Sequence, residues 1–552
     1  MIYSKRIILK RWKIVRLEQY TQPFVSPFYK AYLEDSASLS SFFHYEWNQE
    51  DLNKRLQETD YSKHKRVELA GVITSYMDQF GISEKSRKHI EELKDNGVVV
   101  IGGQQAGILT GPMYSIHKAI SVIVLAKRQR EIQGIPVIPV FWIAGEDHDI
   151  DEINHVYIEK SRKLQKLVFP ERSKLKKIAS ETTFTKETML AYLEEIFKSL
   201  PETSHTKKLY SKFTHFVEEH SNFTTFFSAI MNELFYEEGL LMVDAAYQPL
   251  RQLESDYFVQ MIEQSSDLAS LVFQKEQQLD QLGYGSPIQA KETAANLFYV
   301  EDGERFLLER ESNSFVHEAK GISFTKEELI AIAKDQPEKL SNNVVTRPLM
   351  QEMVFPVLSF IGGPGEIAYW ATLKDAFQLF NMKMPVITPR LSISLVTPKV
   401  QSLLDKLEFS IPDVWSGEVE LSKARMIEEN QNKDVSLFIQ SIKDDLASKY
   451  EELDQLLKRN DIKLTSLVEK NLDFHTKQLT FIENAVEDTI LTKLDSSIYR
   501  YDQLIIQLMP NGGLQERTYS PIQLLNEKGQ DLLVELLQVP YEFNGKHHVV
   551  SI

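Results

Sequence analysis

VVVIGGQQAGILTGPMYSIHKAISVIVLAK, at positions 98–127, combines a strand, a glycine-rich turn and a helix in one continuous run. Val98–Ile101 is an unbroken β-branched segment, typical of strands that are buried on both faces. Gly102 and Gly103 end it, and from Met113 onward apolar residues recur at helical spacing. Such a turn can direct backbone N–H groups and a helix N-terminus at an anionic ligand. We therefore expect a ligand site here.

The glycine turn itself has two interpretations. It matches neither the phosphate-binding pattern GxxxxGK[ST] nor the dinucleotide-binding pattern GxGxxG. The glycines can therefore serve a ligand, or they can serve only to shape a tight connection between strand and helix.

A second strand followed by a polar turn lies about 40 residues further along the chain. Val137–Ala144 is apolar, although two prolines weaken the strand pattern at its beginning, and Glu146–Asp149 follows directly. With a helix between them, the two strands form a predicted βαβ crossover. Both polar turns should then meet at the carboxyl ends of adjacent parallel strands, where ligands bind in open α/β sheets.

Further core strands are predicted around two arginines. Val344–Pro348 and Met384–Arg390 are apolar segments in which Arg347 and Arg390 each end a putative strand, a position suited to a bidentate grip on carboxylate or phosphate. Between them, a second glycine-rich turn at 362–366 is expected to open a helix over 367–380.

The densest group of titratable side chains follows the second strand. His148 stands between carboxylates, so it can act as a general base tuned by Asp147 or Asp149. The acids can instead cap the next helix, or the group can be half of a metal site, although no second group shows a ligand spacing. Lys118, in the helix after the glycine turn, can face either the ligand or solvent.

The amino-acid composition excludes several classes of protein and several kinds of site. The 552 residues carry a formal net charge of −16, which argues against a general electrostatic grip on nucleic acid or anionic membrane. The absence of cysteine excludes disulfides, thiolate metal ligands and a cysteine nucleophile. No signal-peptide core is present, and the longest apolar stretch, 135–144, is too short to span a bilayer. We expect a cytoplasmic protein with no nucleic-acid or membrane partner.

The chain also divides into regions of different character. Residues 422–499 show apolar residues at coiled-coil spacing, with Asn460–Asp461 the best place for a turn between two antiparallel helices. Residues 284–315 are β-like. The expected organisation is a parallel-sheet core over 1–400, interrupted at about 160–230 and 265–335, a helical coiled coil over 401–500, and a segment returning to the core over 501–552.

Several segments together resemble the bacillithiol biosynthesis cysteine-adding enzymes, the BshC family. They are the opening stretch with its glycine turn, PVFWIAGEDHDIDEINHV, NVVTRPLMQEMVFPVLSFIGGPGEIAYWATLK, MPVITPRLS and MPNGGLQER. The resemblance implies an α/β fold with a Rossmann-like parallel-sheet core akin to class I aminoacyl-tRNA synthetases. It also implies two connecting insertions in that core and a coiled coil that dimerises the protein. It also implies the last step of bacillithiol biosynthesis, in which L-cysteine is joined by an amide bond to glucosaminyl-malate. No HIGH or KMSKS motif is present, so synthetase-style adenylation does not carry over by residue.

Amide formation needs an activated carboxyl group, so ATP or another nucleotide is expected as cosubstrate, and no metal is predicted. The catalytic candidates are His148, Asp147, Asp149 and Lys118. The candidates for substrate or nucleotide binding are Gly103, Gln104, Gln105, Gly107, Gly111, Tyr114, Arg347, Gln351, Gly363, Gly365, Glu366, Tyr369 and Arg390. The alternative function is a non-catalytic, nucleotide-binding coiled-coil dimer with a regulatory or scaffolding role.

Overall fold

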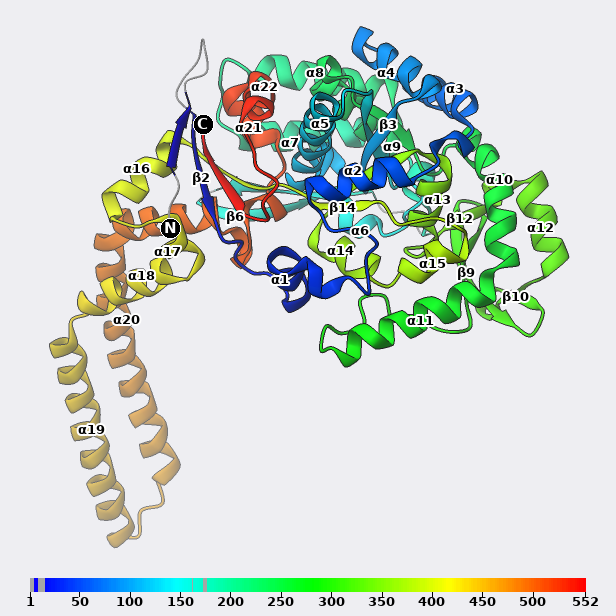
Figure 1. The fold of residues 1–552 in the computed structure, drawn as a ribbon. Helices are drawn as coiled ribbons and strands as arrows, with labels where there is room; N and C mark the ends of the chain where they lie inside the picture. The colour runs from blue at the N-terminus through cyan, green and yellow to red at the C-terminus, as the bar shows by residue number, and fades with distance from the viewer. Residues whose placement is uncertain (1–3, 8–14, 161, 172–175) are drawn as a thin grey trace. The chain divides into compact units, whose positions relative to one another are not determined.

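A computed structural model describes residues 4–7, 15–160, 162–171 and 176–552 of the chain (Figure 1). The chain forms two compact units. The first consists of Met1–Val396 together with Gly513–Ile552, and the second of Thr397–Gly512. The candidate site lies entirely within the first unit.

Within the described residues, five parallel strands form the core sheet of the first unit, in the order β14–β13–β3–β4–β7. Apart from Gln104 at the end of β3, every residue in these strands is buried, as expected for a sheet covered on both faces. The predicted Rossmann-like parallel core is thus confirmed. The strands are β3 Val98–Gln104, β4 Val137–Ile143, β7 Leu241–Asp244, β13 Val357–Gly362 and β14 Val386–Pro389.

The first two of these strands place the two polar turns side by side. β3 and β4 are joined through helix α5 (Tyr114–Gln133) and pair in parallel, with Gly103 opposite Trp142 and Gln104 opposite Ile143. Both turns therefore leave the sheet at the same rim, as predicted.

The remaining elements of the first unit surround this sheet. A second sheet has the order β1–β2–β16–β15, so the C-terminal strand pairs between an N-terminal strand and the strand that follows the core. Its bounds are β1 Ser4–Ile7, β2 Val15–Tyr20, β15 Ser392–Val396 and β16 His547–Ser551. Helices of the two chain ends are α1 Pro27–Glu34, α2 Gln49–Glu58, α3 Arg66–Met77, α4 Glu84–Asp95, α21 Ile522–Lys528 and α22 Asp531–Gln538.

Two long connections interrupt the core. Between β4 and β7 the chain forms α6 Ile150–Ile153, the hairpin β5 His155–Lys160 and β6 Lys163–Val168, and helices α7 Lys186–Ser199, α8 Thr206–Glu219 and α9 Phe223–Phe235. Between β7 and β13 it forms α10 Gln248–Glu263, α11 Ser265–Gln281, β8 Ala294–Glu301, β9 Glu304–Glu311, β10 Ser314–His317, β11 Ile322–Thr325, α12 Lys326–Asp335 and β12 Leu340–Asn342. Gly303, at φ +80°, occupies the predicted hairpin turn between β8 and β9.

Two predicted elements are wrong. Arg347 does not end a strand, because it lies in the first turn of helix α13 (Thr346–Val354). The carboxamide oxygen of Asn343 accepts hydrogen bonds from the backbone N–H groups of Val345 and Thr346 and so starts a helix rather than a strand. The helix expected over 367–380 is two helices, α14 Pro364–Trp370 and α15 Lys374–Leu379.

The second unit is helical. It contains α16 Pro398–Leu407, α17 Ile411–Trp415, α18 Glu418–Glu429, α19 Lys433–Arg459 and α20 Thr465–Leu508. Helices α19 and α20 lie side by side (Figure 1). They are antiparallel, because Lys443 pairs with Glu483 at 2.7 Å while Tyr450 donates to Asn471 at 2.7 Å. The predicted coiled-coil hairpin with its turn at 460–461 is confirmed.

Candidate active site

A cavity of about 380 Å³ opens at the carboxyl ends of β3, β4 and β13, and we call it the strand-end pocket. Most of the residues predicted to bind ligand line it. The lining consists of Gly103, Gln104, Gln105, Tyr114, Lys118, Trp142, Ala144, Asp147, Arg347, Gly363, Pro364, Gly365, Glu366, Tyr369, Arg390 and Arg517. The two glycine turns and the acidic turn, which are far apart in the sequence, thus meet around one space.

Lys118 forms hydrogen bonds with both glycine-rich turns. It is 1% exposed, and its ammonium donates to the Gly103 carbonyl at 2.7 Å and to the carboxylate of Glu366. The same carboxylate accepts the Gly363 N–H at 2.8 Å, which caps the start of α14. Burial lowers the pKa of Lys118, whereas Glu366 opposes that shift. An anion approaching α14 would therefore have to displace Glu366.

Arg390 is held by a carboxylate from the C-terminal segment. Its guanidinium donates to both carboxylate oxygens of Glu516, at 2.9 and 2.6 Å, and to the Leu391 carbonyl at 2.9 Å. Glu516 also accepts from His117 at 2.7 Å and from Ser392 at 3.0 Å, and Arg390 keeps the pKa of this buried carboxyl well below its usual range. The predicted bidentate grip of Arg390 on a ligand is wrong, because Glu516 already occupies the guanidinium fork.

Arg347 and Arg517 differ from these paired cations. Arg347 donates to the Gln351 carboxamide at 3.1 Å and to the Tyr369 hydroxyl, and no described carboxylate pairs with it. The Arg517 side chain is exposed at the pocket and has no hydrogen bond or ion pair with any described residue. These two side chains are the pocket cations that no described carboxylate neutralises. Arg517 was not predicted, although its segment was singled out among the family-like motifs.

Asp147 and His148 line different cavities. Asp147 accepts a hydrogen bond from the Gln105 carboxamide at 2.8 Å, which joins the two polar turns directly. The Nδ1 atom of His148 lies 3.9 Å from the Asp147 carboxylate, too far for a hydrogen bond, and has no partner among the described residues. The prediction that Asp147 or Asp149 holds this imidazole is therefore wrong. Burial and nearby Arg305 lower the pKa of His148, so the ring is neutral near pH 7.

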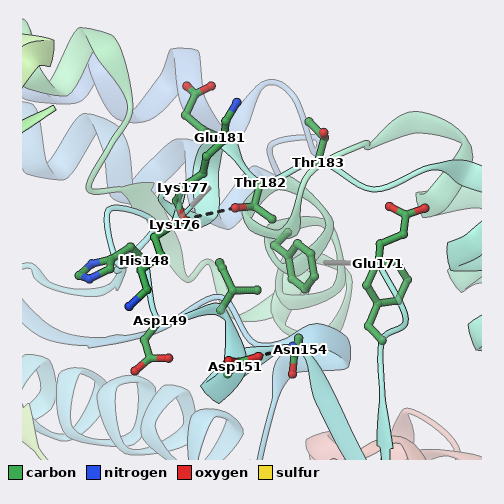
Figure 2. A pocket seen from close by; sticks show the side chains of 13 residues that line it. His148, Asp149, Asp151, Asn154, Glu171, Lys176, Lys177, Glu181, Thr182 and Thr183 are labelled. Carbon is green, nitrogen blue, oxygen red and sulfur yellow. Dashed lines mark hydrogen bonds between the residues drawn. The ribbon is translucent and has the colours of Figure 1, made fainter. Parts of the chain in front are cut away.

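His148 and Asp149 instead line a neighbouring cavity of about 690 Å³, the side pocket (Figure 2). Its wall combines two phenylalanines with side chains of both charges. Besides His148 and Asp149 the lining consists of Ile150, Asp151, Asn154, Phe169, Glu171, Lys176, Lys177, Glu181, Thr182, Thr183 and Phe223. Because Asp147 lines one cavity and the next residue lines the other, the two cavities flank the same turn.

Three predicted binding residues have packing or supporting roles. A Cβ atom at Gly107 would come within 2.7 Å of the Gly111 Cα, so these two glycines allow a close approach of the backbone and do not line the pocket. Leu109 and Thr110 between them have φ of +51° and +71°, so this loop holds backbone strain next to the pocket. Gln351 is buried and supports Arg347.

The described residues contain no group of three or more His, Asp or Glu side chains that could hold a metal ion. In the same part of the chain, none of the helices is long and apolar enough to cross a membrane.

Comparisons with known proteins agree with both units. A family model described as "Bacillithiol biosynthesis BshC, N-terminal Rossmann-like domain" matches residues 13–391, and one described as "Bacillithiol biosynthesis BshC, C-terminal coiled-coil domain" matches residues 393–552. A protein of Lysinibacillus sphaericus (strain C3-41) is 44% identical over 97% of this chain and 99% of its own length. A protein of Geobacillus sp. (strain WCH70) is 37% identical over 96% and 98%, respectively. Both are named "Putative cysteine ligase BshC".

Proposed function

The chain belongs to the BshC family of bacillithiol biosynthesis, and on this basis we propose that it is a ligase that joins L-cysteine to glucosaminyl-malate. The reaction forms an amide bond between the cysteine carboxyl group and the sugar amine, as the last step of the pathway. We further propose that it takes place in the cytoplasm.

One observation carries the assignment to the strand-end pocket. Arg347 and Arg517 are the lining cations that no described carboxylate neutralises. The malate part of the substrate carries two carboxylates, and guanidinium groups bind carboxylates through charge-assisted hydrogen bonds. These two arginines therefore bind malate, and Tyr369 and Gln351 orient Arg347 for that purpose.

Activation of the cysteine carboxyl group is assigned to a nucleotide. A nucleoside triphosphate would supply the leaving group that makes the carboxyl carbon reactive towards an amine. The turn at 102–107 is the candidate for its phosphates, since Gln104 and Gln105 line the pocket beside the start of α5. Lys118 steadies this turn through the Gly103 carbonyl.

His148 is the proposed general base. A sugar amine is mostly protonated near neutral pH and must lose a proton before it can attack, and a neutral imidazole can accept that proton. The lowered pKa of His148 and its partly exposed side chain suit this role. His148→Ala should reduce kcat at least 100-fold with little change in KM, whereas a change in KM alone contradicts this assignment.

The function is tested with the purified full chain. The protein is incubated with L-cysteine, glucosaminyl-malate and ATP, and bacillithiol is measured by mass spectrometry, with reactions lacking each component as controls. Deletion of the gene should in parallel remove bacillithiol and raise the level of glucosaminyl-malate in cell extracts. Unchanged levels of both compounds, with no product in the purified reaction, contradict the ligase function.

A homodimer is proposed through the α19–α20 hairpin. Leu467, Phe474 and Phe481 recur at seven-residue intervals on α20, so they lie on one face of the helix, and they are 59%, 65% and 69% exposed. An exposed apolar stripe of this kind marks a protein interaction surface. The heptad spacing favours another copy of the same hairpin as the partner.

A further inference from the structure

A cavity of about 370 Å³ lies at the amino ends of β13 and β14, and we call it the amino-end cavity. The guanidinium of Arg55 marks its position. It donates to the carbonyl of Val357, the first residue of β13, at 3.2 and 2.9 Å, and to the carbonyl of Lys383, shortly before β14, at 2.8 Å. The strand-end pocket lies at the carboxyl ends of the same sheet. The amino-end cavity is therefore a separate site.

A buried acceptor without a donor lines this cavity. Glu352 is 5% exposed, and one of its carboxylate oxygens pairs with Arg55. The other oxygen, Oε2, is buried and has no hydrogen-bond partner among the described residues. A buried acceptor that is left unsatisfied destabilises the folded state. Burial raises the pKa of Glu352 to about 7, so a cationic donor would favour its charged form at neutral pH.

The rest of the lining is largely polar, but it includes three apolar side chains and an exposed ammonium. Met353, Phe380 and Met382 contribute apolar surface. Lys63 has a side chain that is 76% exposed, and its nearest described carboxylate, that of Asp60, lies 3.9 Å away. Lys383, by contrast, is held by Glu58 at 2.7 Å. The cavity therefore offers a buried acceptor, a few apolar side chains and an outer cation.

We propose that the amino-end cavity binds a free α-amino acid with an apolar side chain. The ammonium of the ligand donates to Glu352 Oε2, its side chain packs against Phe380 and Met382, and its carboxylate faces outward to Lys63. This arrangement supplies the donor that Glu352 lacks and matches the neutral sum of charges around the cavity, in which Arg55, Lys63 and Lys383 oppose Glu58, Asp60 and Glu352. Glu352 shares helix α13 with Arg347, so the same helix borders this cavity and the strand-end pocket.

The position of the ligand is tested with L-selenomethionine, whose selenium gives an anomalous signal in diffraction. Crystals of the full chain are soaked with it. The proposal expects a selenium peak beside Phe380 and Met382. No peak at that position, including a peak only in the strand-end pocket, overturns the proposal.

Affinity is tested in solution by titrating L-methionine into the full chain and measuring heat. Lys63→Ala and Met382→Trp should each weaken the binding at least tenfold, the first by removing the outer cation and the second by filling the cavity. Lys88→Ala, an exposed lysine on α4, is the matched control and should bind as the unchanged protein does. Equal affinity in all four proteins, or no saturable binding, overturns the proposal.

The result is independent of the proposed ligase function. Met382 lies outside the strand-end pocket. The Met382→Trp variant should therefore form bacillithiol at the unchanged rate but lose L-methionine binding. Failure of ligation together with normal L-methionine binding would remove the proposed function and leave this site intact. Glu352→Gln serves as a second variant, with thermal unfolding measured first because Arg55 loses its buried counter-charge.

Discussion

The cations of the strand-end pocket fall into two kinds. Lys118 and Arg390 each pair with a carboxylate of the protein itself, Glu366 and Glu516, so their charges are already neutralised. Arg347 and Arg517 have no such partner within the described residues. A pocket that keeps two cations for its ligand should discriminate strongly in favour of anions.

The first prediction concerns these two arginines. Arg347→Ala and Arg517→Ala should each raise KM for glucosaminyl-malate about 10- to 100-fold, because each removes a charge-assisted hydrogen bond of about 1.5–3 kcal/mol. Steady-state kinetics on the purified variants measures the effect. Arg128→Ala, on the exposed part of α5, is the control and should leave KM unchanged. Unchanged KM in both pocket variants would show that malate binds elsewhere.

The second prediction concerns Asp244 at the end of β7. Burial raises the pKa of this carboxyl from 3.8 to about 6, against hydrogen bonds from Ser180 and the Ala246 N–H. A raised pKa gives stability that is fully present below about pH 4 and is lost as pH rises through about 6. Between pH 4 and 7 the free energy of unfolding of the unchanged protein should therefore fall by roughly 1–3 kcal/mol relative to that of the Asp244→Asn variant.

Urea unfolding at a series of pH values measures this difference. Asp267→Asn, at an exposed position, is the matched control, and its difference from the unchanged protein should stay constant with pH. A constant difference for Asp244→Asn as well would contradict the raised pKa.

The residues that form the site could be predicted from the sequence more readily than the contacts between them. Gln105 and Asp147 were expected to meet because each follows a strand of one βαβ unit. The pairing of Arg390 with Glu516 joins positions 126 residues apart, and no local pattern fixes such a contact. The same reason explains why Arg517 was missed.

At the scale of elements, the loop between β3 and α5 depends on close backbone packing. The third prediction is that Gly107→Ala lowers the free energy of unfolding by about 1–3 kcal/mol, because its Cβ would clash with the Gly111 Cα. Turnover should fall with it, since the loop carries Gln105. Gly71→Ala, in helix α3 with nothing within 4 Å of the added Cβ, is the control and should not destabilise. Equal stability of the two variants would contradict the packing role.

The fourth prediction concerns the α19–α20 hairpin. Replacing both Phe474 and Phe481 with Glu should convert a dimer into a monomer, because it places charges in the exposed apolar stripe. Light scattering coupled to size-exclusion chromatography measures the mass. The exposed pair Lys477→Glu and Lys470→Glu on the same helix is the control and should remain dimeric. A monomeric mass for the unchanged chain would contradict the proposed dimer.

Elements with long, regular patterns were predicted well, and those governed by one capping residue were not. The strand at 98–104 and the hairpin at 433–508 follow from sustained runs of apolar residues. The segment at 343–348 has the valines of a strand, yet the Asn343 side chain starts a helix there. Composition over a few residues cannot decide between these outcomes.

For the whole chain, neighbouring strands could be predicted from the sequence only where two strands follow one another through a helix. The neighbouring positions of β3 and β4 were predicted on that ground, whereas β13 pairs with β3 across more than 250 residues of chain. The C-terminal segment contributes β16 to the second sheet, Arg517 to the lining of the strand-end pocket and Glu516 as the partner of Arg390. The C-terminal segment is thus required before the site is complete.

The central claim is that the turns after β3 and β4 share the pocket in which ligation occurs. The most direct measurement is a crystal structure of the full chain with glucosaminyl-malate bound. We expect the malate carboxylates to lie against Arg347 and Arg517, with the sugar amine towards His148. Substrate bound elsewhere, with the strand-end pocket free of it, would contradict this placement.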